Sequence, residues 1–198
     1  MSTTNPIPDP TFDVAGYAER MTALRTADGL SRRSVAALAG RSERVIQAEE
    51  GGWRAHSTVD VGLRVALATG ADIRLLLDGP TDEFAASLSR RRPPPADWSV
   101  LADRVIGLIG PRLSAMLSQS GWAKADADRM IGQSSESRLT ARWIAGHPNY
   151  WPDFGRLDVL CRRAGRTTVG ALMSSLIDDA RNLHASESPH VAGPSASA

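Results

Sequence analysis

The chain has 198 residues, of which 23 are basic and 22 acidic, so its net charge at neutral pH is only +1. A charge so close to zero argues against a protein that binds nucleic acid through electrostatics alone. Hydrophobic residues make up 42% and aromatic residues only 5%, which favours small, tightly packed helices over sheets, and the expected fold class is all-α.

Several classes of protein are not expected from the sequence. No run of 18 apolar residues exists, and residues 1–13 lack a basic stretch followed by an apolar one, so we expect no membrane span, no signal peptide and a cytoplasmic location. The single cysteine, Cys161, excludes an intramolecular disulfide and has the spacing of a core residue. No catalytic motif and no zinc-like Cys and His spacing is present, so we expect no enzyme activity, no cofactor and no metal.

The chain begins with residues 1–13, where three prolines and no periodic apolar residues predict a disordered arm. Five short helices are expected over residues 14–79, the first of them carrying Tyr17, Met21 and Leu24 on one face. The expected helix starts and stops are Ser31, Gly40, Ser42, Gly51, Gly52, Gly70 and Gly79.

Residues 80–99 are expected to form a linker. Residues 81–88 have the composition of a helical extension, but the three prolines of residues 93–95 favour polyproline II. The arginines at 90–92 are interpreted as a solvated end of this linker, with contact to a DNA backbone as the alternative. A second helical domain is expected over residues 100–180, with a kink or a new helix at Pro111, followed by a disordered tail over residues 181–198.

The two helical segments read alike, and glycines mark the match. The matching pairs, with their separations in residues, are Gly29 and Gly121 (92), Gly40 and Gly132 (92), Gly52 and Gly146 (94), and Gly70 and Gly165 (95). The drift places two additional residues between Gly132 and Gly146 and one more beyond it. Two copies are too few for a solenoid, so a tandem pair of small domains is expected.

The first copy has a set of residues at fixed spacings: Gly29-Leu30-Ser31, Ala36, Leu38-Ala39-Gly40, Ser42, Ile46, Glu50, Gly52, residues 66–70 and residues 75–79. In these residues the chain resembles the lambda-repressor-like, or xenobiotic-response-element type, helix-turn-helix family. The second copy keeps fewer of the spacings, and Asp128 stands where a small apolar residue normally lets the second and third helices approach. We interpret it as a diverged copy of the same fold.

The resemblance implies that the third helix of each copy lies in the major groove, where every base pair presents a distinct pattern of donors and acceptors. The residues it places on bases are Glu43, Arg44, Gln47 and Ala48 in the first copy and Ser135, Glu136, Arg138 and Arg142 in the second. The residues it places on phosphates are Arg32, Arg33, Arg41, Ser42, Trp53, Arg54, Lys124 and Ser134. The alternative for Glu43 and Arg44 is an acid favoured by the helix dipole beside a solvated neighbour.

These expectations combine into a sequence-specific regulator of transcription that binds double-stranded DNA and acts as a repressor, in the setting of phage immunity or a mobile element. A monomer with two DNA-reading domains is expected rather than a homodimer, and its site should be asymmetric because the two reading helices differ. The alternative is that only the first domain binds DNA and the second is a dimerisation or protein-docking module. No membrane partner is expected, and contact with RNA polymerase is left open.

Overall fold

The computed structural model describes residues 12–52, 58–134, 136, 138–147 and 152–187. Within these ranges the regular secondary structure is entirely helical, and β-type pairing is limited to one antiparallel bridge between Thr58 and Asp153. The all-α expectation is therefore confirmed. None of the helices in the described ranges is both long enough and apolar enough to cross a membrane.

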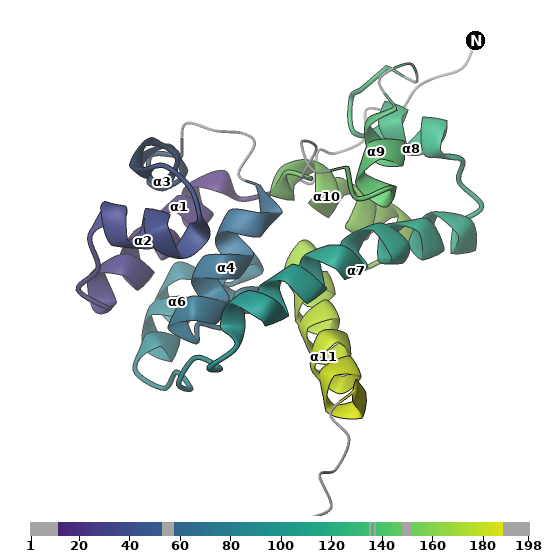
Figure 1. The fold of residues 1–198 in the computed structure, drawn as a ribbon. Coiled ribbons are helices and arrows are strands. Elements are labelled where there is room, and N and C mark those ends of the chain that lie inside the picture. The colour runs from purple at the N-terminus through teal and green to yellow at the C-terminus, as the bar shows by residue number, and fades with distance from the viewer. Residues whose placement is uncertain (1–11, 53–57, 135, 137, 148–151, 188–198) are drawn as a thin grey trace, which may run out of the picture.

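The first part of the chain folds into six short helices (Figure 1). Gly40 and Gly70 end two of them in the left-handed region, at φ values of 63° and 68°, which glycine adopts without a steric penalty. The helices are α1 (Val14–Ala27), α2 (Arg32–Ala39), α3 (Glu43–Glu50), α4 (Val59–Thr69), α5 (Ile73–Asp78) and α6 (Thr81–Leu88). Since α6 packs against α1, the first half of the expected linker belongs to the helical body.

The second part of the chain is dominated by two long helices (Figure 1). Its elements are α7 (Trp98–Gln119), α8 (Lys124–Met130), α9 (Leu139–Ile144), α10 (Phe154–Leu160), the π-helical turn η2 (Cys161–Gly165) and α11 (Val169–Glu187). The helix α7 continues through Pro111, where the sequence predicts a kink or a new helix. The proline removes one backbone hydrogen bond, but the carbonyl group it leaves is on exposed Gly107, where water can replace the bond.

Left-handed residues recur at matching positions along the two parts. They are Gly29, Gly40, Gly52 and Gly70 in the first part and Gly121, Gly132, Gly146 and Arg166 in the second. The last pair differs from the expected match of Gly70 with Gly165. The Thr167 amide donates to the Cys161 carbonyl, one residue further back than the Ala71 amide reaches to Ala66, because the π turn accommodates one more residue and moves the left-handed position to Arg166.

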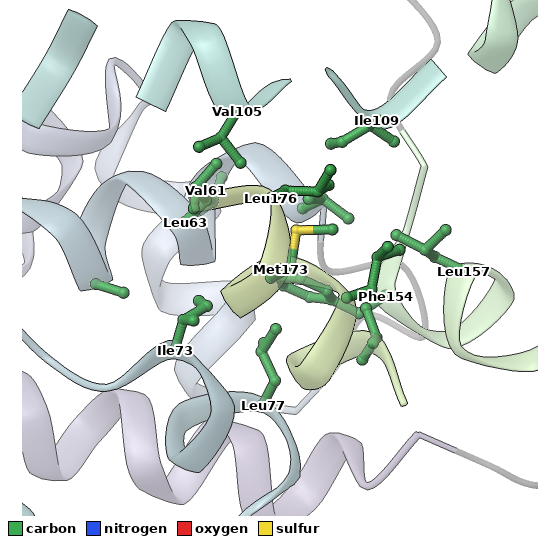
Figure 2. Packing of buried hydrophobic residues seen from close by; sticks show 14 of the residues in the cluster. Val61, Leu63, Ile73, Leu77, Val105, Ile109, Phe154, Leu157, Met173 and Leu176 are labelled. Carbon is green, nitrogen blue, oxygen red and sulfur yellow. The ribbon is translucent and has the colours of Figure 1, made fainter. Parts of the chain in front are cut away.

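Both parts contribute to one hydrophobic core, in which α4 packs against α7 and α5 against α11 (Figure 2). Cys161 is buried in this core, as its spacing predicts, and burial raises the pKa of its thiol. The rings of Phe12 and Tyr17 lie 5.4 and 5.5 Å from the Phe154 ring of α10. The core residues labelled in Figure 2 are Val61, Leu63, Ile73 and Leu77 from the first part and Val105, Ile109, Phe154, Leu157, Met173 and Leu176 from the second.

Candidate nucleic-acid interface

The outer face of α3 carries the residues that the sequence places on bases in the first part. Ile46 and Glu49 are buried and fix the rotation of the helix, so Glu43, Arg44 and Gln47 are exposed on the opposite side. Ala48 is half-buried at the edge of the same face. One short helix therefore presents an acid, a guanidinium and an amide side by side to solvent.

Two exposed arginines give positive charge to this face and to the neighbouring start of α2. Arg33 lies on the first turn of α2 and Arg44 on the first turn of α3, and neither forms an ion pair within the described ranges. Ser42, the residue before α3, is exposed and makes no capping hydrogen bond to the helix through its side chain. These groups remain available to a ligand at the α2–α3 turn.

Arg32, by contrast, belongs to a structural ion cluster. Its Nε donates to Glu50 Oε2 at 2.7 Å, while Arg25 of α1 donates to both oxygens of the same carboxylate. The Glu50 side chain is only 2% exposed, whereas that of Arg32 is 43% exposed. The cluster joins α1, α2 and α3, so a phosphate that met Arg32 would meet a guanidinium already held by a carboxylate.

Arg41, another expected phosphate contact, is also engaged. It forms an ion pair with Asp60 on the first turn of α4, whose side chain is 5% exposed, while Arg41 itself is 37% exposed. Glu49 and Asp60 are buried, as is the side chain of Glu50, so the acids at the end of α3 and the start of α4 face the interior. Burial raises the pKa of the Tyr17 hydroxyl, and the negative charges of Glu49 and Asp60 raise it further.

The matching region of the second part is built around a buried acid. Asp128 of α8 is 1% exposed, and its Oδ1 accepts from the Thr140 amide at 2.8 Å and from the Thr140 hydroxyl at 2.6 Å. Thr140 is the second residue of α9, so the carboxylate caps a free amide at the start of that helix. Asp128 and Thr140 occupy the positions that correspond to buried Ala36 and Ile46 in the first part. A hydrogen-bonded pair thus replaces an apolar one, and this accounts for the departure of Asp128 from the pattern.

The helix α9 is shorter than its counterpart and begins later. It has six residues where α3 has eight, and the residue before it, Arg138, is left-handed with φ 50°. Arg138 and Glu136 are exposed, whereas Arg142 is half-buried. The two additional residues between Gly132 and Gly146 are thus accommodated before the helix rather than within it.

Of the remaining residues expected to contact DNA, some lie within the described ranges and some outside them. Lys124 is the first residue of α8 and, like Ser134, is exposed. Trp53, Arg54 and Ser135 lie outside the described residues. In Figure 1, α3 and the pair α8 and α9 lie at opposite ends of the molecule and both near its upper edge, with α4 and α10 between them.

Sequence reasoning did not assign the partners that hold this surface in place, namely Glu50, Asp60 and Thr140. A signal for Glu50 was present, since Glu49 and Glu50 follow Ile46 by three and four residues and so share its inward face. The contact between Asp128 and Thr140 had no local signal, because the two residues belong to different helices.

No group of three or more His, Cys, Asp or Glu side chains that could hold a metal ion occurs in the part of the chain that the structure describes. Comparison with known proteins yields no matching family model, no similar curated protein and no similar solved structure.

Proposed function

We propose that this protein is a sequence-specific regulator of transcription that binds double-stranded DNA through helix-turn-helix units and represses by occupying its site. The observation that carries the proposal is the outer face of α3, where Glu43, Arg44 and Gln47 are exposed together on a helix fixed from behind. An α-helix fits the major groove, and these three side-chain types are suited to base edges.

Each residue of this face has a defined role in the proposal. Arg44 donates to O6 and N7 of a guanine, Glu43 accepts from N4 of a cytosine, and Gln47 pairs with an adenine. Arg33 binds a phosphate and sets the register of α3 on the duplex. Arg32 and Arg41 position the unit through Glu50 and Asp60 and reach phosphate only with the N–H groups that their carboxylates leave.

Preorganisation supports the proposal. Side chains that read bases must be presented by a rigid element, because ordering a mobile one costs free energy on binding. Here the ion pairs of Glu50 and Asp60 tie α3 and the turn before it to α1, α2 and α4. The side chains of Glu50 and Asp60 are buried, so the charge that faces the ligand is set by the exposed Arg33, Glu43 and Arg44.

The test is selection of bound sequences from random duplexes with the full chain, followed by the substitution Arg44→Ala. We expect Arg44→Ala to weaken specific binding by about 1–3 kcal/mol and to relax the preference at one base pair. Arg181→Ala is the control, because it removes the same charge from the distal part of α11 and should leave both quantities unchanged. A preferred sequence that is unaltered by Arg44→Ala would remove the base-reading role.

A second candidate function is that only the first part reads DNA and the second is a docking or dimerisation module. The late start of α9, with left-handed Arg138 and half-buried Arg142, favours it. Light scattering on a selected duplex separates the two: one chain on a site with two different halves supports reading by both parts. Two chains on a palindrome support the second candidate.

A further inference from the structure

The two parts of the chain meet through residues that occupy matching positions. Thr58 immediately precedes α4, Asp153 immediately precedes α10, and these two residues face one another in the antiparallel bridge. The Val59 amide donates to the Pro152 carbonyl at 3.1 Å beside them. Each residue of the bridge therefore pairs with its own counterpart.

A second contact of the same kind lies between α5 and α11. Asp72 caps α5 and Thr168 caps α11, so Arg74 and Gly170 are each the second residue of their helix. A Cβ atom added to Gly170 would lie 3.1 Å from the Arg74 Cα. Here, too, a residue approaches its counterpart, so closely that a side chain at Gly170 would press on the Arg74 backbone and on the Asp78 side chain.

Contact between a residue and its own counterpart identifies the symmetry of the arrangement. In an isologous, two-fold interface such contacts lie on the axis, whereas a head-to-tail interface brings different surface patches together. A half-turn about the axis also exchanges the two strands of an antiparallel bridge and leaves the bridge unchanged. Two copies related by translation would instead run parallel. Thr58 with Asp153 and Arg74 with Gly170 are two separate points on one approximate two-fold axis.

We infer that the two parts form an internal pseudo-dimer whose DNA site consists of two different half-sites in inverted orientation, read by a single chain. The inference rests on the proposed function. A two-fold axis between two reading helices matches the two-fold axes of a duplex, and this requires inverted half-sites. A tandem duplication alone, with its units joined head to tail, would favour a direct repeat.

The identity of each half-site is set separately. The outer face of α3 carries Glu43, Arg44 and Gln47, whereas the corresponding end of the second part carries Arg138 and Arg142. The geometry is that of a palindrome, but the two halves differ in sequence. Because both parts share one core, the spacing between the half-sites is fixed by packing rather than by a flexible linker.

The experiment uses the full chain and three duplexes built from the selected site. Arg44→Ala and Arg138→Ala first identify which base pairs belong to α3 and which to the second part. The duplexes then present the two halves inverted at the selected spacing, as a direct repeat at that spacing, or inverted with five more base pairs between them. Thermal unfolding verifies that both variants are folded.

We expect the inverted site at the selected spacing to bind about 100-fold more tightly than the other two, because only there do both parts engage at once. Equal or tighter binding to the direct repeat overturns the inference while leaving the proposed function intact. So does an Arg138→Ala variant that selects the same bases as the unaltered chain. Failure to enrich any sequence removes the proposed function and, with it, this inference.

Discussion

The carboxylate of Glu50 holds α3 against two neighbouring helices. It is buried and accepts hydrogen bonds from two arginines on two other helices. Glu50→Gln removes the charge and replaces one acceptor by a donor that faces a guanidinium. We expect a loss of about 1.5–3 kcal/mol in the free energy of unfolding, the range for hydrogen bonds to charged groups, measured by urea denaturation.

Glu43→Gln is the matched control for that substitution. It makes the same change on the same helix at an exposed position, where surface substitutions change stability by no more than about 0.5 kcal/mol. Equal losses for the two variants would show that the ion cluster does not stabilise the fold.

For the side chains around α3, the sequence predicted which ones face solvent but not which partners they bind. The periodicity around Ile46 places Glu43, Arg44 and Gln47 outward, and they are exposed. It does not reveal that Arg32 and Arg41 have carboxylate partners, because Glu50 and Asp60 are 18 and 19 residues further along the chain. Their contact with phosphate stays a prediction, now in competition with an ion pair.

The turn between α4 and α5 supports the segment that leads into α7. Gly70 is left-handed, and a Cβ atom there would lie 2.0 Å from the Arg92 carbonyl oxygen. Gly40 has nearly the same φ, yet its Cβ would meet nothing within 4 Å. Comparing substitutions at the two glycines thus distinguishes the free-energy cost of backbone strain from that of a steric collision.

We therefore expect Gly40→Ala to cost about 1–2 kcal/mol and Gly70→Ala about 1–3 kcal/mol more from the collision, both measured by denaturant unfolding. Equal costs would mean that residues 90–94 do not pack against this turn. The same packing holds Arg91, which pairs with Asp28, so this member of the arginine triplet is bound within the fold rather than solvated.

The start of α9 depends on the contact between Asp128 and Thr140. Asp128→Ala leaves the amide and the hydroxyl of Thr140 buried without this acceptor, and we expect a loss of about 2–3 kcal/mol in the free energy of unfolding. In a double-mutant cycle with Thr140→Val, the two substitutions should be non-additive by at least about 0.5 kcal/mol. Strict additivity would contradict a direct interaction.

Helices were easier to predict than the ways in which they end. The order of helices in both parts follows from apolar spacing and from the glycines that close the turns. The π turn η2 does not, since Cys161 is buried and the spacing around it is equally compatible with an α-helix. The left-handed residue consequently moved from the glycine that the sequence offered, Gly165, to Arg166.

The helices α5 and α11 correspond to each other but end differently, and the arginines that face them, Arg20 and Arg112, therefore have different partners. Arg20 of α1 is buried and donates to the Leu76 and Leu77 carbonyls where α5 ends, and burial lowers the pKa of its guanidinium. The matching Arg112 pairs instead with Asp179, because α11 continues and uses its carbonyls internally. Sequence offsets identify such pairs of residues but not the partners they find.

The pairing of Thr58 with Asp153 can be tested in the whole molecule without DNA. The hydrogen bond beside this pair makes it the non-hydrogen-bonded kind, in which the Cα atoms are about 4.5 Å apart, within disulfide range. In a Cys161→Ala background, Thr58→Cys with Asp153→Cys should form a disulfide in air, detected by mobility on a non-reducing gel. It should raise the free energy of unfolding by about 2 kcal/mol.

Arg44→Cys with Arg138→Cys is the control. Arg44 belongs to α3 and Arg138 precedes α9, and these two helices lie at opposite ends of the molecule (Figure 1), so the pair should remain reduced. Cross-linking of the control pair within one chain, or none between 58 and 153, would contradict the arrangement of the two parts. The sequence predicted that there are two parts, but not this arrangement, because it arises from contacts between residues about ninety positions apart.

The shared core of Figure 2 has a consequence for how the protein responds to its own abundance. A regulator assembled from separate subunits loses its active form on dilution, since the paired form scales with the square of the subunit concentration. Two parts joined in one chain around one core have no such step. Under the proposed function, occupancy of a weakly filled DNA site would follow the first power of protein concentration, so halving synthesis would halve the active species instead of quartering it.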